Sequence, residues 1–135
     1  MKTMGLDFGE KRIGVALSDI LGFLASPHST LVRTELNKDI EYLKKIIDEN
    51  KVETVVFGLP LEMSGNKGKT SMLVEDFAEK LKESTNVKIV FVDERLSSVE
   101  AEEQLKLTIK DWRKRKELLD QVSASIILQC YLDSK

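Results

Sequence analysis

The chain has 135 residues, of which 41% are hydrophobic and 33% are charged, the composition of an ordinary globular domain. Its one cysteine, Cys130, excludes an internal disulfide, and its formal net charge of −2 does not by itself indicate nucleic-acid binding. No apolar run reaches the roughly 18 residues of a membrane span, and the first nine residues lack the apolar core of a signal peptide. We therefore expect one domain over residues 1–135, in the cytoplasm, with no membrane partner.

Three extended segments open the chain. Residues 2–7 predict a short strand that ends in an acid, and residues 12–18 predict a second strand. Turn-forming residues lie between them, so an antiparallel hairpin is the expected arrangement. A third extended segment, residues 23–31, contains Pro27, which cannot donate to a sheet ladder and therefore favours an edge strand.

Helices and strands alternate in the rest of the chain. Apolar and helix-forming patterns predict helices over residues 35–50, 71–84, 98–107 and 116–133. β-Branched and apolar runs predict strands over residues 52–58 and 87–92, and loops are expected over residues 60–70 and 109–115. The order β-β-β-α-β-α-β-α-α implies a mixed sheet with helices on its faces.

Carboxylates follow the first and the last of these strands. Asp7 ends the strand at residues 2–7, and Asp93 and Glu94 follow the strand at residues 87–92. Ligands bind beyond the carboxyl ends of strands in open α/β sheets, so parallel and neighbouring strands would bring Asp7 and Glu94 to one edge. Acids also end strands because they are solvated there, and this pair alone does not decide between the two interpretations.

A third carboxylate, Asp120, lies about one turn inside the last predicted helix. The face that it shares is small near Asp120 and apolar beyond it: Ser123, Ala124, Ile127, Leu128 and Tyr131. Small side chains let a helix approach a sheet closely, so we expect Asp120 to face the sheet. A carboxylate on an inward face needs a partner, either an arginine or a metal ion. The alternative, an acid favoured by the helix dipole, applies best to the first turn.

Three carboxylates directed at one point would repel one another unless their pKa values rise or cations bind. Oxygen ligands suit Mg²⁺ or Mn²⁺, and two such ions about 4 Å apart stabilise an in-line displacement at phosphorus. The trio contains no histidine or cysteine, which argues against zinc. The sequence therefore predicts a metal-dependent nuclease in which Asp7, Glu94 and Asp120 are both metal ligands and catalytic residues.

Positive charge clusters in the run that contains Trp112 and is sparser in the first hairpin, in the loop at residues 60–70 and beside Glu94. Such groups suit phosphate contacts, and an aromatic residue among arginines suits base stacking. The candidate nucleic-acid-binding residues are Lys11, Arg12, Lys67, Lys69, Arg95, Arg113, Lys114 and Arg115. Ordinary solvated surface charge, with Trp112 packed on the domain, is the alternative. Cys130 lies in an apolar helix and is expected in the core.

Four segments together resemble the YqgF family, also called the RuvX family, of pre-rRNA nucleases and relatives of Holliday-junction resolvases. They are LDFGEKRIGVALSD (6–19), VVFGLPLEMSGNKG (55–68), FVDERLSSVEAEEQL (91–105) and LLDQVSASIILQCYL (118–132). The resemblance implies an α/β, RNase H-like fold with a mixed five-stranded sheet flanked by helices. It also implies that Asp7, Glu94 and Asp120 match the family's acidic site, and that the role is maturation of the 16S rRNA 5′ end in the cytoplasm.

One departure from that resemblance concerns the number of metal ions. In the related resolvases a fourth acid follows the third by one helical turn, and this chain has Ser123 there. Tight binding of two metals is therefore in question, and phosphate oxygens of the substrate would have to supply ligands.

Other functions remain open on the sequence. A Holliday junction resolvase acting on DNA would need a dimer, because two strands must be cut, whereas a monomer or weak homodimer suits an rRNA nuclease. A non-catalytic nucleic-acid-binding module would fit the mild negative charge and Ser123. The segment LDFGEKRIG also resembles the phosphate-binding hairpin of the actin and sugar-kinase superfamily, but those phosphotransferases enclose a nucleotide between two domains.

Overall fold

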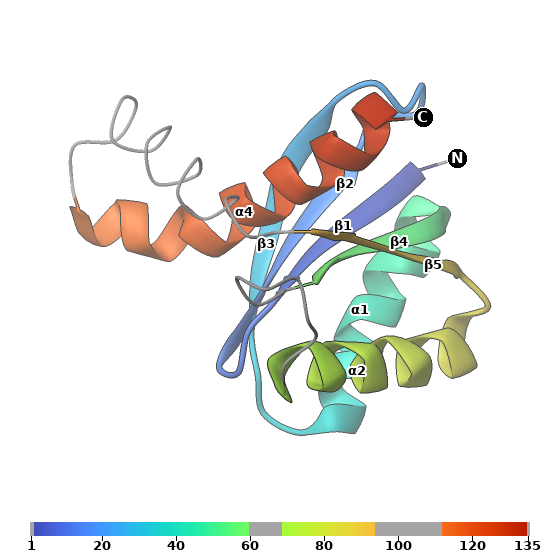
Figure 1. Ribbon diagram of the computed structural model, residues 1–135, viewed down its shortest axis with the longest axis vertical. Coiled ribbons are helices and arrows are strands. Elements are labelled where there is room, and N and C mark those ends of the chain that lie inside the picture. The colour runs from blue at the N-terminus through green and yellow to red at the C-terminus, as the bar shows by residue number, and fades with distance from the viewer. Residues whose placement is uncertain (1, 60–68, 94–111, 135) are drawn as a thin grey trace.

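The computed structural model describes residues 2–59, 69–93 and 112–134. Within these residues five strands form one sheet: β1 (Lys2–Phe8), β2 (Arg12–Ser18), β3 (Ala25–Val32), β4 (Val52–Leu59) and β5 (Lys88–Asp93). The helices of the described part are α1 (Leu36–Asn50), α2 (Lys69–Thr85) and α4 (Trp112–Ser134). Figure 1 shows α1 and α2 on one side of the sheet and α4 on the other.

The strand order is β3-β2-β1-β4-β5. β2 runs antiparallel to both β1 and β3, whereas β4 runs parallel to both β1 and β5. This arrangement confirms the predicted hairpin and the predicted mixed five-stranded sheet. It also confirms the edge position of the strand that contains Pro27, because β3 closes one side of the described sheet.

Two predicted loops are shorter than expected. Lys69 and Thr70 belong to α2, and residues 112–115 belong to α4. The second error arose because a run of charge was interpreted as a solvated loop, although lysine and arginine are good helix formers. The predicted helix at 98–107, and residues 60–68 and 109–111 of the two loops, lie outside the described residues.

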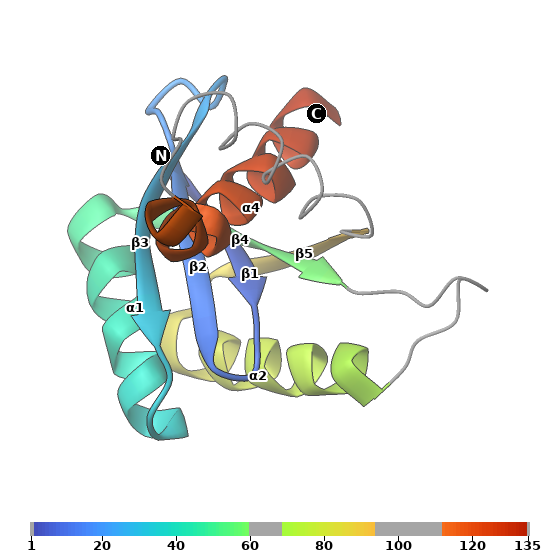
Figure 2. The same cartoon turned by 90° about the vertical axis from the view of Figure 1, so that its left-hand side faces the viewer.

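The alternation of side chains along the strands divides the core into two clusters, one on each face of the sheet. Met4, Leu6 and Phe8 of β1 belong to the larger cluster, which contains the buried apolar side chains of α1 and α2. The smaller cluster joins α4 to the other face, where Ala16 and Val56 are fully buried. Figure 2 shows α4 crossing β1, β2 and β3 on this second face.

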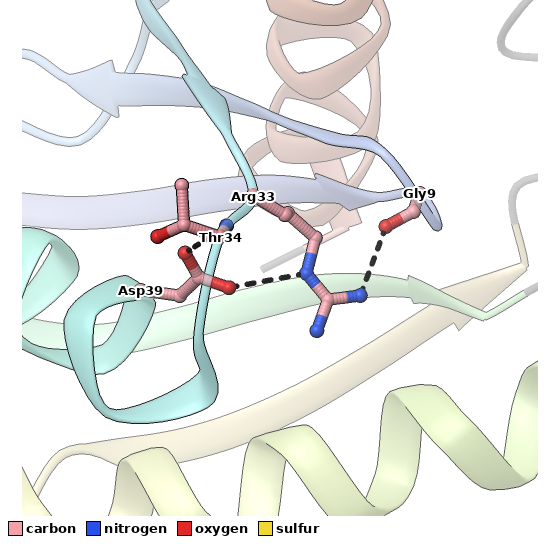
Figure 3. A network of polar contacts seen from close by, with 4 residues as sticks. All are labelled: Gly9, Arg33, Thr34 and Asp39. Atoms are coloured by element: carbon pink, nitrogen blue, oxygen red, sulfur yellow. Dashed lines mark hydrogen bonds and ion pairs between the residues drawn. The ribbon is translucent and has the colours of Figure 1, made fainter.

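A partly buried ion pair joins Arg33, the residue after β3, to α1 and to the β1–β2 turn (Figure 3). Nε of Arg33 donates to Oδ2 of Asp39 at 3.3 Å, and Nη1 of Arg33 donates to the carbonyl oxygen of Gly9 at 3.3 Å. Oδ1 of Asp39 accepts from the backbone N–H of Thr34 at 3.2 Å, which ties the first turn of α1 to the residue before its N-cap, Glu35. The guanidinium also lies 4.6 Å from the ring centroid of Phe8. These contacts fix the turn that directly follows Asp7 and Phe8.

Among the described helices, none is both long enough and apolar enough to cross a membrane.

We expect Arg33→Met to lower the free energy of unfolding by about 3 kcal/mol, because it leaves the buried carboxylate of Asp39 without its counter-ion. The side chain of Asp39 is 2% exposed, so the carboxylate depends on its protein partners rather than on solvent. The measurement is urea unfolding followed by circular dichroism. Lys45→Met is the matched control, since Lys45 and Glu49 form an exposed pair on α1 and should change stability by less than about 0.5 kcal/mol. Equal losses in both variants would contradict this account.

Candidate active site

Two glycines allow α4 to lie directly on the hairpin of β1 and β2. A Cβ atom on Gly14 would overlap the backbone carbonyl oxygen of Asp120, and one on Gly5 would lie 2.6 Å from Cβ of Leu128. Real side chains do not approach so closely, so any larger residue at either position would push the helix away. The distance between α4 and the sheet is therefore set by the absence of a side chain at Gly5 and Gly14.

This close packing brings Asp7 and Asp120 to the same place. Asp7 is the partner of Gly14 across the β1–β2 ladder, and the backbone of Asp120 lies over Gly14. Asp7 also shares a strand face with Gly5, the face toward α4, because alternate residues of a strand point the same way. The structure thus places Asp120 on the sheet-facing side of its helix, as the helical spacing predicted.

Asp120 has an arginine as its partner. Nε of Arg12 donates to Oδ2 of Asp120 at 2.8 Å, and the two side chains are 46% and 22% exposed. Arg12 lies two residues before Gly14 on β2, on the same strand face, which explains why it reaches the helix. Of the two partners that the sequence allowed, an arginine or a metal ion, the structure contains the arginine. Because the ion pair is at the surface, Arg12 can leave it without opening the core.

β5 runs parallel to β1, with β4 between the two. The register pairs Gly58 of β4 with Val92 of β5, and Leu59 with Asp93. With neighbouring strands about 4.8 Å apart, the end of β5 lies about 10 Å across the sheet from β1. We expected Asp7 and Glu94 to converge if their strands were parallel and near each other, and β1 and β5 are parallel with one strand between them. Glu94 lies outside the described residues, so its place at the site stays a prediction.

Ser123 follows Asp120 by one helical turn and is buried at 1% exposure. Its Oγ has no hydrogen-bond partner among the described residues. A buried hydroxyl without a partner is unfavourable, so Oγ of Ser123 is available to a water or a ligand oxygen. Sequence reasoning noted Ser123 as the replacement of an acid but did not foresee that it is unsatisfied.

The structure separates the candidate nucleic-acid-binding residues into three groups. Lys11 and Arg12 lie on the β1–β2 hairpin beside the two aspartates, and Lys11 is exposed. Lys69 begins α2, and Arg113, Lys114 and Arg115 form part of the first two turns of α4. Arg115 precedes Asp120 by five residues, about 7.5 Å along the helix axis. Lys67 and Arg95 lie outside the described residues.

The expectation for Cys130 is wrong, because this cysteine is exposed. The buried stripe of α4 contains Ala124, Ile127 and Leu128. Cys130 is two residues beyond Leu128, a turn of about 200°, so it lies on the opposite side of the helix from Leu128.

Residues 1–134 match the RuvX family, which is described as Holliday junction resolvase. A protein of Carboxydothermus hydrogenoformans is 49% identical over 135 residues, covering 100% of this chain and 98% of that protein. A protein of Syntrophomonas wolfei is 47% identical over 133 residues, covering 98% and 94%. Both carry the name "Putative pre-16S rRNA nuclease".

Two groups of solved structures share the fold at low sequence identity. RuvC of T. thermophilus in complex with a Holliday junction substrate aligns with a TM-score of 0.63 at 9% identity, covering 99% of this chain and 94% of that one. The Fowlpox virus resolvase in complex with Holliday junction DNA aligns with a TM-score of 0.59 at 12% identity, covering 99% and 98%. These similarities confirm the RNase H-like fold that the sequence predicted.

We expect Gly14→Ala to lower the free energy of unfolding by at least about 2 kcal/mol, because the added methyl group forces α4 away from the sheet. Thermal and urea unfolding would measure the loss. Gly22→Ala is the control: Gly22 has a positive φ of 77°, but its Cβ would meet no atom within 4 Å. That variant should lose only the roughly 1–2 kcal/mol of left-handed backbone strain. A Gly14→Ala protein as stable as the parent would show that the helix does not need this contact.

Proposed function

The chain belongs to the RuvX family, and from this membership we propose that it is a divalent-metal-dependent nuclease that hydrolyses phosphodiester bonds in pre-16S rRNA. The observation that carries the proposal is the position of Asp120 over Gly14, the ladder partner of Asp7. Two acids that come from elements more than a hundred residues apart share one sheet face. We further propose that residues 1–135 act as one domain in the cytoplasm.

We propose that Asp7, Glu94 and Asp120 together hold Mg²⁺ or Mn²⁺. Among the described residues no three acidic, histidine or cysteine side chains form a metal site, so the proposal needs Glu94 as the third ligand. The chemistry of the described donors fits a hard cation, because Asp7 and Asp120 both offer carboxylate oxygens. Asp120 already binds a positive group, the Arg12 guanidinium, and the unsatisfied hydroxyl of Ser123 lies one turn away.

A bound divalent cation would supply Lewis-acid activation of water and would stabilise the charge that develops on the phosphate oxygens. The chain's own residues position the reactants. Asp7 is fixed by the ladder on one side and by the Arg33–Gly9 contact two residues later. Asp120 is fixed through its own backbone on Gly14. Arg12, once released from Asp120, is placed to pair with a phosphate of the substrate at the same edge.

Pre-16S rRNA is the proposed substrate because relatives that match nearly the full chain carry that name. Exposed hairpin cations beside the aspartates, Lys11 and Arg12, would contact the RNA backbone. Resolution of a DNA four-way junction is the second candidate, favoured by the shared fold of the RuvC complex with its Holliday junction. That activity requires two sites in a dimer, whereas a monomer suffices for the processing of one RNA end.

We expect Asp7→Asn to reduce cleavage of a precursor RNA with a 5′ leader by at least about 100-fold in Mg²⁺, while RNA binding is retained. The loss follows because the amide keeps the shape of the side chain but not the charge that holds a cation. Cleavage rates and RNA affinity are measured on the same preparation, with a four-way DNA junction as a parallel substrate. Asp48→Asn, an exposed acid on α1, should leave cleavage unchanged. Full activity of Asp7→Asn would favour the non-catalytic binding module.

We expect Arg12→Gln, at RNA concentrations well below KM, to lower the Mg²⁺ concentration for half-maximal activity by about threefold to tenfold, because it removes a positive group that competes for Asp120. The same change should raise KM for RNA, since a phosphate partner is lost. Lys11→Gln is the matched neighbour: it should raise KM but leave the Mg²⁺ dependence alone, since Lys11 forms no ion pair with Asp120. Identical Mg²⁺ titrations for the Arg12→Gln variant and the parent would contradict competition at Asp120.

A further inference from the structure

The loop between β2 and β3, here called the 19–24 loop, displays a patch of large apolar side chains. Ile20, Leu21, Phe23 and Leu24 are 72%, 75%, 68% and 65% exposed. Single exposed apolar residues are normal on a protein surface, but four large ones within five residues form a contiguous patch. Such a patch is typical of a surface that another molecule covers.

The backbone of the 19–24 loop is held in one conformation. Oδ1 of Asp19 accepts from the N–H groups of Phe23 at 2.8 Å and Leu24 at 3.3 Å, and the carbonyl of Asp19 accepts from Gly22. Gly22 adopts a φ of +77°, which favours glycine. The backbone hydrogen bond from Phe23, with a smaller contribution from that of Leu24, lowers the pKa of the Asp19 carboxyl below its usual value. A loop fixed in this way loses little entropy when it binds.

The C-terminal part of α4 is hydrogen-bonded to the same loop. Nε2 of Gln129 donates to the carbonyl of Phe23 at 2.8 Å, and Oε1 of Gln129 accepts from the N–H of Ala25 at 2.9 Å. Nε2 of Gln129 also donates to Oδ1 of Asp133 at 2.9 Å. The charged side chains in this network, Asp19 and Asp133, are therefore both acidic.

The 19–24 loop lies at the end of the sheet opposite to the aspartate pair. β2 pairs Gly14 with Asp7 but Leu17 with Met4, so the loop that follows Ser18 is about 15–20 Å from Asp7. Figure 1 shows the loop beside the C-terminus, away from the β1–β2 turn. The hairpin cations Lys11 and Arg12 are at the other end. A molecule on the loop would therefore not cover the aspartates.

We propose that the 19–24 loop docks on a basic protein of the precursor ribosomal particle, an inference that rests on the proposed function. Apolar side chains beside acidic groups do not suit RNA or an anionic lipid surface, both of which attract cations. A second copy docked through the same loop would present the same two acids, Asp19 and Asp133, and so would bring no cation from this network to pair with them. Proteins that bind rRNA are basic as a class, and a basic rim around an apolar recess complements this loop.

The test compares two forms of one substrate: precursor small-subunit particles, and the same precursor rRNA freed of protein. We expect Leu21→Ser/Phe23→Ser to bind the particles at least about tenfold more weakly than the parent, because two exposed anchors are lost. Binding and cleavage of the protein-free RNA should be unchanged. Val32→Ser is the matched control, since Val32 is 67% exposed on β3 outside the loop. Asp133→Lys, which reverses one acidic charge, should also weaken particle binding.

Several results would overturn the proposal. The first is equal binding of the particles by the parent and the double variant. The second is an equal loss of binding by the double variant on protein-free RNA. The third is a parent that sediments as a dimer and a double variant that sediments as a monomer. Parent binding to anionic phospholipid vesicles that the double variant lacks would do the same, since the occupant would then be a membrane. Failure of the proposed function is a separate result: the parent would not cut protein-free RNA, while the difference in particle binding could still be measured.

Discussion

The contact between α4 and the β1–β2 hairpin is the constraint on which the site depends. It exists because Gly5 and Gly14 leave no side chain between the helix and the strands. Asp120 is consequently positioned by its own backbone, which rests on Gly14, rather than by a long side chain that reaches across a gap. A carboxylate held through backbone contact changes position little, and small errors of position are costly at a site that must hold reactants in line.

The two faces of the sheet differ: one carries most of the apolar core, and the other carries the aspartate pair. The face covered by α1 and α2 contains the larger apolar cluster, and the Arg33–Asp39 pair joins it to the β1–β2 turn. The face covered by α4 has a smaller cluster and bears the two aspartates. Asp7 lies where the two meet, because its neighbour Phe8 packs into the larger cluster while Asp7 itself is on the α4 face. Packing of Phe8 on one face therefore fixes the backbone of β1 and with it the position of Asp7 on the other face.

Local periodicity was enough to predict the helices and strands of the described residues. Alternation along the strands, the proline of β3 and the small face of α4 led to a mixed sheet and to an inward Asp120, and the structure confirms these. Contacts between distant residues were not predictable. Arg12 and Asp120 are 108 positions apart, and no local pattern links them. The first turn of α4 was not predicted because a charged run resembles a solvated loop. The exposure of Cys130 was not predicted because the segment around it is apolar on several sides, so its sequence does not indicate which side faces solvent.

The Arg12–Asp120 pair also bears on how a site with Ser123 in place of a fourth acid can work. An arginine on Asp120 balances its charge while no substrate is present, so the acids can lie on one face without full repulsion. In the proposed nuclease, a cation that takes Oδ2 of Asp120 would displace that guanidinium, which would then face the edge where a phosphate arrives. Cation binding and phosphate binding would be linked by this one exchange, and linkage is reciprocal: each would favour the other by the same factor. A chain with fewer carboxylates would then gain its affinity for metal ions chiefly when its nucleic acid is bound.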